Sequence, residues 1–268
     1  MRIGVTGATG VLGRLVHALL RVRGFQPDSF DGDICSQSEV SHWVRNDYSG
    51  VIHLAAVVPT EEVKEMPFKA ISVNVGGTIN LLQTLHLQKL RPWIFYASTS
   101  HVYKPAKIAI KEDSAIDPIS FYGSTKRQGE EACLAFSSQY KLSVCIGRIF
   151  SFFHETQMEP FLFPSWTKKL SKRSLEPQYE VINGEDIRDF SQADHIADSI
   201  VALLVMQATG VYNIGSGKGT RVIDFIQAIN QSAKLIAIQE NQPTMLVANV
   251  EKLQLLVGQH GVHKIKLL

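Results

Sequence analysis

A glycine-rich loop between a short strand and a helix is the feature that most constrains how this chain can fold. The run Arg2–Thr6 is rich in β-forming residues and is followed by Gly7, Gly10 and Gly13. Leucines and valines then recur at helical spacing over residues 12–23. Glycines at this spacing permit a tight turn in which the backbone closely approaches a pyrophosphate at the helix N-terminus. The pattern predicts a Rossmann-type unit that binds a dinucleotide.

Strand-like and helix-like stretches continue to alternate beyond this unit. Strands are predicted at 26–30, 51–56, 93–97, 142–146 and 211–214, and helices at 74–87, 122–140 and 194–206. Most of these strands are apolar, as buried parallel strands are, whereas the one at 26–30 is polar and weakly patterned. Such alternation argues for an α/β fold with a doubly wound parallel sheet.

The alternation of strand-like and helix-like stretches breaks down after Arg148. Residues 150–163 are aromatic and irregular. We therefore expect a dinucleotide-binding Rossmann domain at 1–150, to which 187–214 returns, and a small substrate-binding lobe at 151–268. The sequence has no flexible linker between the two parts, so they should pack around a cleft.

Composition argues against several kinds of partner. The chain has 268 residues and a net charge of +2, so we expect a large core and no nucleic-acid surface. The cysteines, Cys35, Cys133 and Cys145, lack metal-ligand spacing, so we expect free thiols in a reducing compartment and no metal site. The first strand follows no signal peptide, and no apolar stretch approaches the roughly 20 residues that span a bilayer. A cytoplasmic protein with no membrane partner is predicted.

A tyrosine and a lysine four residues apart, in Tyr122-Gly-Ser-Thr-Lys126, carry the strongest chemical signal. On a helix the two side chains lie on one face, about one turn apart. An ammonium beside a phenol lowers the pKa of the tyrosine from about 10 toward neutrality, so that it can exchange a proton with a sugar hydroxyl or carbonyl. The pair follows the glycine loop, Asn74 and the strand end Ser98-Thr99-Ser100 in a fixed order. That order favours a catalytic site over an ordinary surface helix.

An acidic residue about 20 positions beyond the glycine loop should bind the adenosine ribose. Asp28, Asp31 and Asp33 compete for this role, and Asp31 is preferred. A carboxylate here repels a 2′-phosphate, and no Arg or Lys occurs between Asp31 and Val44, so NAD(H) is favoured. Arg14, at the start of the first predicted helix, could instead serve NADP(H), which is not excluded.

Taken together, the motifs resemble those of the extended short-chain dehydrogenase/reductases that act on nucleotide sugars, the NAD-dependent epimerase/dehydratase family. The resemblance extends over nearly the whole chain. It rests on the glycine loop, on the Tyr-Lys pair, and on the segments 51–56, 74–80, 94–103, 184–190 and 212–218. These motifs are specific for the superfamily and less specific for the reaction.

The resemblance implies a role for individual residues. Tyr122 is the acid/base, Lys126 holds the nicotinamide ribose, and Thr99 hydrogen-bonds the reacting sugar oxygen. Asp33 and Ile34 resemble the adenine-pocket pair. The expected cofactor-binding residues are Gly7, Thr9, Gly10, Val11, Leu12, Gly13, Asp31, Asp33, Ile34, Leu54, Ala55, Ala56, Asn74, Ser98, Tyr122, Lys126 and Ile149.

On the substrate side the resemblance implies Ser100, His101, Ser151, His154 and Arg188. Arg188 resembles the residue that neutralises the substrate diphosphate, with an ion pair to a neighbouring aspartate as the alternative. Ser151 stands where many relatives have an asparagine. His101 and His154 lie near the Cys and His of bifunctional epimerase-reductases, and either face the sugar or are ordinary loop residues.

The residues after Thr99 narrow the reaction. Dehydratases of the family carry an Asp-Glu pair here, whereas this chain has Ser100 and His101. Together with a chain that is short for the family, this favours a reductase of a nucleotide-linked 4-keto-(6-deoxy)sugar. An NAD-dependent nucleotide-sugar 4-epimerase is the alternative, and a non-catalytic dinucleotide-binding protein a minor one.

The family resemblance also implies a homodimer. Its interface would be formed by the predicted helices at 74–87 and 122–140. The candidates for its apolar face are Leu81, Leu82, Leu85, Cys133 and Phe136, which could alternatively cover the sheet.

Overall fold

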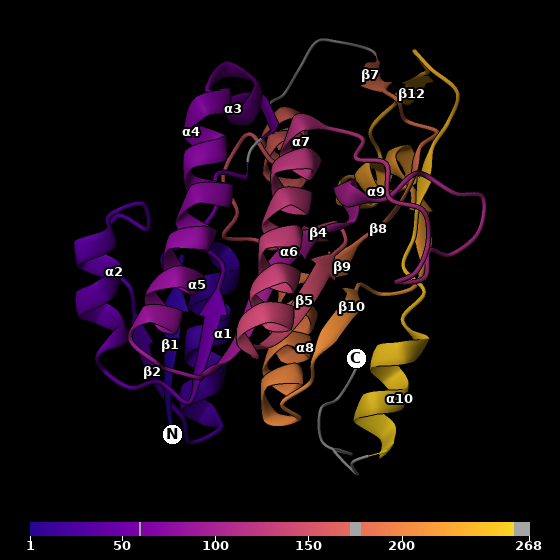
Figure 1. Ribbon diagram of the computed structural model, residues 1–268. Helices are drawn as coiled ribbons and strands as arrows, with labels where there is room; N and C mark the ends of the chain where they lie inside the picture. The colour runs from indigo at the N-terminus through magenta and orange to yellow at the C-terminus, as the bar shows by residue number, and fades with distance from the viewer. Residues whose placement is uncertain (59, 172–177, 260–268) are drawn as a thin grey trace.

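A six-stranded parallel sheet lies at the centre of the computed structural model, which describes residues 1–58, 60–171 and 178–259 (Figure 1). Its strand order is β10-β5-β4-β3-β1-β2. The strands are β1 (Arg2–Thr6), β2 (Gln26–Ser29), β3 (Gly50–His53), β4 (Trp93–Thr99), β5 (Ser143–Ile149) and β10 (Gly210–Ile214). The predicted α/β fold with a doubly wound parallel sheet is confirmed.

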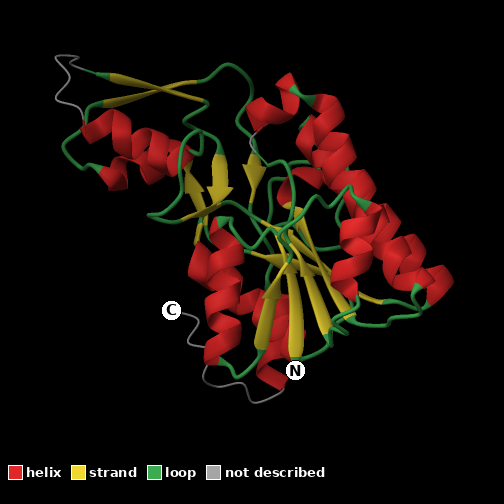
Figure 2. Cartoon of the chain, turned by 90° about the vertical axis from the view of Figure 1, so that its left-hand side faces the viewer, coloured by secondary structure: helices red, strands yellow, loops and turns green. Residues whose placement is uncertain are grey.

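Helices cover both faces of this sheet (Figure 2). On one face lie α1 (Val11–Val22) and α8 (Ala193–Val205), and on the other α2 (Gln37–Val44), α5 (Thr78–Leu87) and α6 (Phe121–Tyr140). Because β3, β4 and β5 are buried on both faces, their sequences are nearly continuous apolar runs. Within the described part of the chain, we find no helix with the length and hydrophobicity needed to cross a membrane.

The polar second strand is explained by its position at the edge of the sheet. β2 pairs with β1 alone, and an edge tolerates Pro27, which has no N–H to donate. The carboxylate of Asp28 accepts hydrogen bonds from Tyr48 Oη at 2.6 Å and Asn46 Nδ2 at 3.0 Å. Asp28, one of the three candidates for the ribose, therefore fixes this edge to the loop between α2 and β3.

The crossover from β3 to α5 differs from its predicted form. The strand expected at 51–56 ends at His53, and residues 54–58 form a loop instead. After α3 (Thr60–Glu65) and α4 (Pro67–Ile71), a π-helical turn, η1 (Ser72–Gly77), precedes α5 where one continuous helix over 74–87 was expected. The side chain of Asn74, inside this turn, hydrogen-bonds the backbone of the loop, so both departures belong to one local structure.

Shorter elements form the rest of the molecule beside the carboxyl ends of the sheet (Figure 1). These are β6 (Phe152–Phe153), α7 (Leu162–Ser171), β7 (Tyr179–Ile182), β8 (Ile187–Asp189), β9 (Ser191–Gln192), β11 (Gly219–Arg221), α9 (Val222–Ile229), β12 (Leu235–Ile238) and β13 (Met245–Leu246). β8 lies between β11 and β13, and β7 pairs with β12. The helix α10 (Glu251–Gln259) packs against β10, with Leu253 in the core of the main sheet.

The residues suggested for a dimer face lie mostly in the core. Leu81, Leu82, Leu85 and Cys133 are at most 1% exposed and pack between their helices and the sheet. The prediction that these four form an intermolecular face was therefore wrong, because helical spacing does not distinguish a face toward the sheet from one toward a partner. Phe136 is partly buried in the same cluster.

Candidate active site

A cavity of about 550 Å³ opens at the carboxyl ends of β1, β3, β4 and β5. Its walls combine the glycine loop, the strand ends, the first turns of α6, and the irregular segment after β5. The carboxyl edge of a doubly wound sheet is where ligands of such folds bind. The cavity thus brings together segments that are far apart in the sequence.

Sixteen of the residues expected in the site line this cavity. They are Gly7, Gly10, Val11, Leu12, Gly13, Leu54, Ala56, Ser98, Thr99, Ser100, His101, Tyr122, Lys126, Ile149, Ser151 and Arg188. The glycine loop, the Thr-Tyr-Lys set and most of the expected substrate residues therefore face one space.

Seven of the expected residues lie outside its walls: Thr9, Asp31, Asp33, Ile34, Ala55, Asn74 and His154. Ile34 is buried, and Asp33 accepts a hydrogen bond from the backbone of Cys35 at 2.9 Å. His154 hydrogen-bonds Thr156 and lies 3.8 Å from the Asp194 carboxylate. In this structure His154 is not part of the cavity wall, and its role toward the sugar stays a prediction.

The glycine loop has the geometry of a dinucleotide cradle. Gly7 has a φ of +68°, and a Cβ there would lie 2.7 Å from the Ala55 nitrogen. A Cβ on Gly13 would lie 2.2 Å from the Gly7 carbonyl oxygen. Because these clashes involve backbone atoms, no larger side chain fits between the loop, the start of α1 and the end of β3. The residues present therefore fit the close backbone approach that a pyrophosphate requires.

Thr99, Tyr122 and Lys126 are positioned by the end of β4 and the start of α6. Ser120 is the N-cap of α6, and its hydroxyl accepts a hydrogen bond from the Gly123 N–H at 3.0 Å. This cap places Tyr122 in the first turn, with Lys126 one turn later and facing the same cavity.

The electrostatics of the pair differ from the sequence expectation. Burial raises the pKa of the Tyr122 phenol well above its ordinary value, and a hydrogen bond with Thr99 opposes this only in part. Burial lowers the pKa of Lys126 to about 8. Its ammonium lies 4.2 Å from the centre of the Tyr96 ring. The expectation that Lys126 moves the pKa of Tyr122 toward neutrality is therefore not met in this arrangement, because desolvation of the phenol dominates.

A chain of buried hydrogen bonds beneath the cavity was not foreseen. The Ala55 N–H donates to Thr6 Oγ1, which lies 2.7 Å from His53 Nδ1, and His53 Nε2 lies 3.0 Å from Thr78 Oγ1. Burial lowers the pKa of His53 to about 3, so the ring is neutral and relays hydrogen bonds without carrying charge. The strand ends are thereby tied to the crossover helix.

Asn74 extends this support to the loop that lines the cavity. Its amide accepts from the Val57 N–H at 2.7 Å, and donates to the Val57 carbonyl and to Thr125 Oγ1, both at 3.0 Å. Thr125 in turn donates to the Tyr122 carbonyl. Asn74 thus holds the loop and α6 in place from behind the cavity wall.

His101 and Arg188, two of the residues expected to contact the substrate, both line the cavity. Burial lowers the pKa of His101 to about 4, so its ring is neutral near pH 7. His101 Nδ1 is 3.1 Å from Ser120 Oγ, and its ring meets Tyr122 edge-on at 6.0 Å. Arg188 forms the ion pair with Asp186, at 2.7 Å, and also lines the cavity. The ion pair with a neighbouring aspartate is therefore present, and the diphosphate-binding role of Arg188 stays a prediction.

An aromatic wall completes the cavity and was only partly visible in the sequence. It consists of Phe150, Phe152, Phe153, Phe161, Phe163 and Phe190, and further unforeseen lining residues are Val58, Glu61, Ala97, Gln157, Pro160, Leu162 and Val222. The aromatic character of residues 150–163 was a signal, whereas Phe190 reaches the wall only through the fold. Phe190 stacks on Phe225 at 4.0 Å, which fixes the ring from behind.

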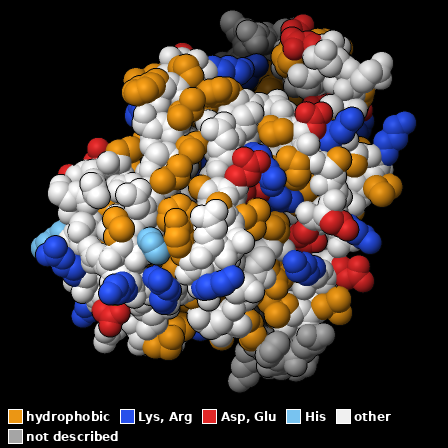
Figure 3. Space-filling view, in the orientation of Figure 1, with side chains coloured by type: hydrophobic (Ala, Val, Ile, Leu, Met, Phe, Trp, Pro, Cys, Tyr) orange, Lys and Arg blue, Asp and Glu red, His pale blue; other side chains and the backbone are white. Residues whose placement is uncertain are grey.

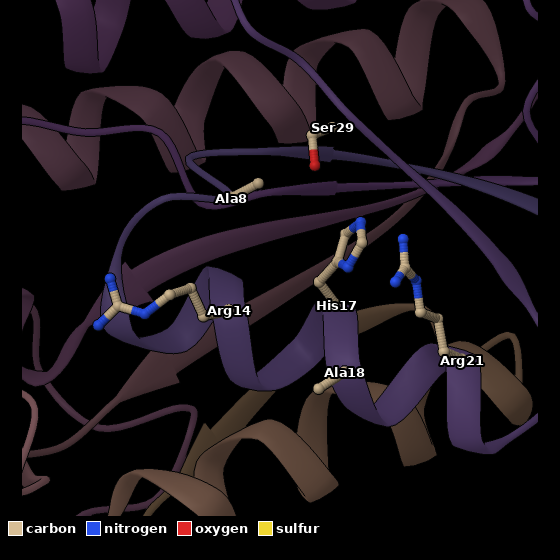
Figure 4. Close-up of a pocket in the computed structure, with 6 residues that line it drawn as sticks. All are labelled: Ala8, Arg14, His17, Ala18, Arg21 and Ser29. Carbon is tan, nitrogen blue, oxygen red and sulfur yellow. The ribbon is translucent and has the colours of Figure 1, made fainter.

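A second hollow of about 400 Å³ lies on the other side of the glycine loop, lined by Ala8, Arg14, His17, Ala18, Arg21 and Ser29 (Figure 4). Figure 4 shows His17 and Arg21 side by side on α1, with Arg14 apart from them. Arg14 donates to the Thr9 carbonyl at 2.5 Å and to Thr156 Oγ1 at 3.2 Å. The residue that would favour NADP(H) is therefore engaged within the protein. The described residues include no cluster of three or more potential metal-ligating side chains.

The fold and this site define the class of extended short-chain dehydrogenase/reductases, the NAD-dependent epimerases and dehydratases of nucleotide sugars. The family model described as GDP-mannose 4,6 dehydratase matches residues 5–259, and the chain belongs to that family.

Relatives within this family catalyse different reactions. The chain is 25% identical to GDP-6-deoxy-D-mannose reductase from Pseudomonas aeruginosa, over 87% of this chain and 81% of that protein. It is 27% identical to a putative UDP-arabinose 4-epimerase 2 from Arabidopsis thaliana, over 70% of this chain. The chain spans 50% of that epimerase's length.

Solved structures reproduce the fold. RMD from Pseudomonas aeruginosa complexed with NADPH superposes with a TM-score of 0.86 and 22% identity, over 96% of this chain and 92% of that one. The UDP-glucose 4-epimerase of Thermus thermophilus, in complex with NAD, gives a TM-score of 0.82 and 20% identity, over 95% and 92%. Neighbours of this fold thus bind either dinucleotide.

Proposed function

We propose that this chain is a nucleotide-sugar oxidoreductase that reduces a nucleotide-linked 4-keto-(6-deoxy)sugar with NAD(P)H. The observation that carries the proposal is the convergence of Thr99, Tyr122 and Lys126 on the cavity that also contains the glycine loop. The identity with the Pseudomonas reductase, over most of both chains, supports it. Asp31 and Asp33, the ribose candidates left after Asp28 is engaged by Tyr48 and Asn46, favour NAD(H), and NADP(H) is not excluded.

The chemistry follows from the positions of the side chains. When bound, the reduced dinucleotide supplies the hydride. Gly7, Gly10 and Gly13 would hold its pyrophosphate, and Lys126 its nicotinamide ribose. Tyr122, kept protonated by burial, can give its proton to the oxygen of the keto group.

Thr99 and Arg188 would orient the sugar nucleotide around that proton transfer. Thr99 would hydrogen-bond the same keto oxygen as Tyr122. Arg188 would meet the diphosphate, and His101, Ser100 and Ser151 the sugar.

The Asp-Glu pair that dehydratases of the family carry after the threonine is absent from this chain. Ser100 and His101 follow Thr99, and of the described residues that line the cavity Glu61 carries the only carboxylate. Elimination of water from a hexose needs an acid to protonate the leaving hydroxyl and a base to remove the neighbouring proton. The proposal is therefore a reductase, although the family takes its name from a dehydratase.

The second candidate is an NAD-dependent nucleotide-sugar 4-epimerase, which the similarity to the plant epimerases favours. It would use the same three residues and would recycle its dinucleotide. A non-catalytic dinucleotide-binding protein is a weaker candidate, since Tyr122 and Lys126 are both present and both face the cavity.

One assay separates these candidates. GDP- and UDP-linked 4-keto-6-deoxyhexoses are offered with NADH and then with NADPH, and the reduced-nicotinamide absorbance is followed. The corresponding simple nucleotide-hexoses are offered in parallel, and the products are analysed. The reductase consumes reduced dinucleotide with one of these substrates. Interconversion of 4-hydroxyl epimers without net consumption would move the assignment to the epimerase. Formation of a 4-keto-6-deoxy sugar from a simple nucleotide-hexose would overturn both.

We also propose that residues 1–150 hold the dinucleotide, with 187–214 returning to their sheet. The rest of 151–268, apart from α10, which packs on the main sheet, would bind the sugar nucleotide. A cytoplasmic location is proposed as well. A homodimer through α5 and α6 is proposed with a revised set of contacts. Ile79, Leu87 and Leu134 are 37%, 60% and 42% exposed on these helices. Figure 3 shows hydrophobic side chains at the surface over this part of the molecule.

A further inference from the structure

A fully buried carboxylate lies one helical turn beyond Lys126. Glu130 follows Lys126 by four residues on α6 and has no exposed surface. Side chains at this spacing lie on the same face of a helix. The carboxylate therefore lies under the same wall of the cavity as the lysine, although it is not among the residues that line it.

Four donated hydrogen bonds hold the Glu130 carboxylate. Ser98 Oγ donates to Oε1 at 2.5 Å and Arg148 Nε donates to the same oxygen at 2.9 Å. Arg148 Nη2 and Arg127 Nη1 donate to Oε2 at 2.8 and 3.0 Å. The Glu130 carboxylate is therefore the negatively charged partner in ion pairs with Arg127 and Arg148.

Arg148 has further partners besides Glu130. Its Nη1 donates to the Glu112 carbonyl at 3.0 Å, and its guanidinium stacks 4.6 Å from the centre of the Tyr103 ring. The Glu130–Arg148 ion pair is almost fully buried, with side-chain exposures of 0% and 4%. A buried pair of this kind adds little stability in itself, because desolvation offsets the attraction. A role beyond stability is therefore reasonable.

Lys126 needs a counter-charge at this place. The lysine is 2% exposed, and burial lowers its pKa to about 8, an effect that the charges of Cys133 and Glu130 oppose. Since burial raises the pKa of Cys133 to about 12, its thiol is neutral near pH 7. Of these two groups, Glu130 is thus the one that is ionised when the enzyme would work.

We propose that Glu130 is a positioning residue for Lys126, with a carboxylate that Arg148 and Ser98 hold in place so that its negative charge keeps the lysine an ammonium. The proposal rests on the proposed function in one respect: it requires that Lys126 contacts the dinucleotide. The other titratable or charged groups around Lys126 are His53 on β3, Tyr96 on β4, Arg148 on β5, His101 after β4, Glu61 on α3, and Tyr122, Arg127 and Cys133 on α6.

Replacement of Glu130 by glutamine tests the charge with little change of shape. Side chains four residues apart on a helix have Cβ atoms about 6 Å apart, and at an effective dielectric constant near 20 a unit charge at that separation shifts a pKa by about two units. Without the carboxylate, Arg127 and Arg148 are also left uncompensated, so the pKa of Lys126 falls further below 8. The affinity for NADH is titrated by fluorescence from pH 6 to 10. We expect the pH at which this affinity declines to be one to two units lower in Glu130→Gln than in wild type.

Two further variants make the test specific. Glu131→Gln is the matched control, because Glu131 is an exposed neighbour that bonds Arg127 alone, and its profile should coincide with that of wild type. Arg127→Gln removes a cation from the partly exposed end of the network and should move the decline to higher pH, by about half a unit.

The outcomes are distinguishable. A folded Glu130→Gln variant with an unshifted profile would overturn the proposal, even if its affinity were uniformly lower, since a merely structural role predicts that result. If Glu130→Gln does not fold, an unshifted or downward-shifted Arg127→Gln profile overturns it instead. A wild-type profile in Lys126→Met would contradict the proposed role of the lysine, which is a failure of the proposed function and not of the charge network.

Discussion

Replacement of Asn74 by leucine tests whether this residue supports the cavity from behind or contacts the cofactor. Asn74 is fully buried, and its amide satisfies both the N–H and the carbonyl of Val57. Leucine has a similar size and leaves both backbone groups without a partner, at a cost of about 1–3 kcal/mol each. We therefore expect a loss of roughly 2–6 kcal/mol in the free energy of unfolding, a large part of the 5–15 kcal/mol typical of a domain.

Urea denaturation followed by tryptophan fluorescence measures this loss, and NADH titration measures its effect on the site. Asn80→Ala is the matched control, since Asn80 lies on the same crossover and its side chain donates one hydrogen bond, to the Ile34 carbonyl at 2.8 Å. It should cost about 0.5–1.5 kcal/mol. Unchanged stability in Asn74→Leu, together with a loss of NADH affinity, would refute the reasoning and place Asn74 in direct contact with the dinucleotide.

Three further outcomes are expected. Tyr122→Phe should lower kcat by about 10²–10⁴-fold with NADH affinity nearly unchanged, and a kcat near that of wild type would contradict the acid role of the phenol. Fluorescence titration should show tighter binding of NADH than of NADPH, in wild type and in Arg14→Ala alike; a preference for NADPH that disappears in Arg14→Ala would show that this guanidinium outweighs Asp31 and Asp33. Leu134→Glu should convert a dimer into monomers in light scattering, whereas Gln128→Glu, at an exposed position on a different face of α6, should not. A wild-type chain that is monomeric at micromolar concentration would contradict the proposed interface.

The sequence was sufficient to predict the sheet and the residues at the carboxyl ends of its strands. Parallel strands buried on both faces leave continuous apolar runs, and the turns that follow them carry glycines or polar residues at fixed places. The sequence therefore predicts Gly7 and Thr99 at strand ends, and the order of the motifs and the family resemblance add Tyr122 to the same site. The polar strand β2 was harder to recognise, because an edge strand needs no apolar run.

Other features depended on contacts between distant segments. Spacing along 74–87 does not show that Leu81 and Leu85 face the sheet, nor that a π-helical turn begins the helix. The Glu130–Arg148 pair joins residues 18 positions apart through side chains that look like ordinary surface charges in the sequence. The pKa of Tyr122 likewise depends on burial, which no local pattern of residues reports.

The pairing of β10 with β5 bears on how readily such a chain can be remodelled. The backbone leaves the sheet after Ile149 and comes back at Gly210, which starts the neighbouring strand. Because the two anchor strands lie side by side, the ends of the intervening excursion are fixed whatever its length. Doubling a flexible loop costs only about 0.6 kcal/mol in closure entropy. Insertions or deletions between these two strands can therefore reshape the aromatic wall. The glycine loop and Tyr122 keep their places, because the strands and helices that carry them are unchanged.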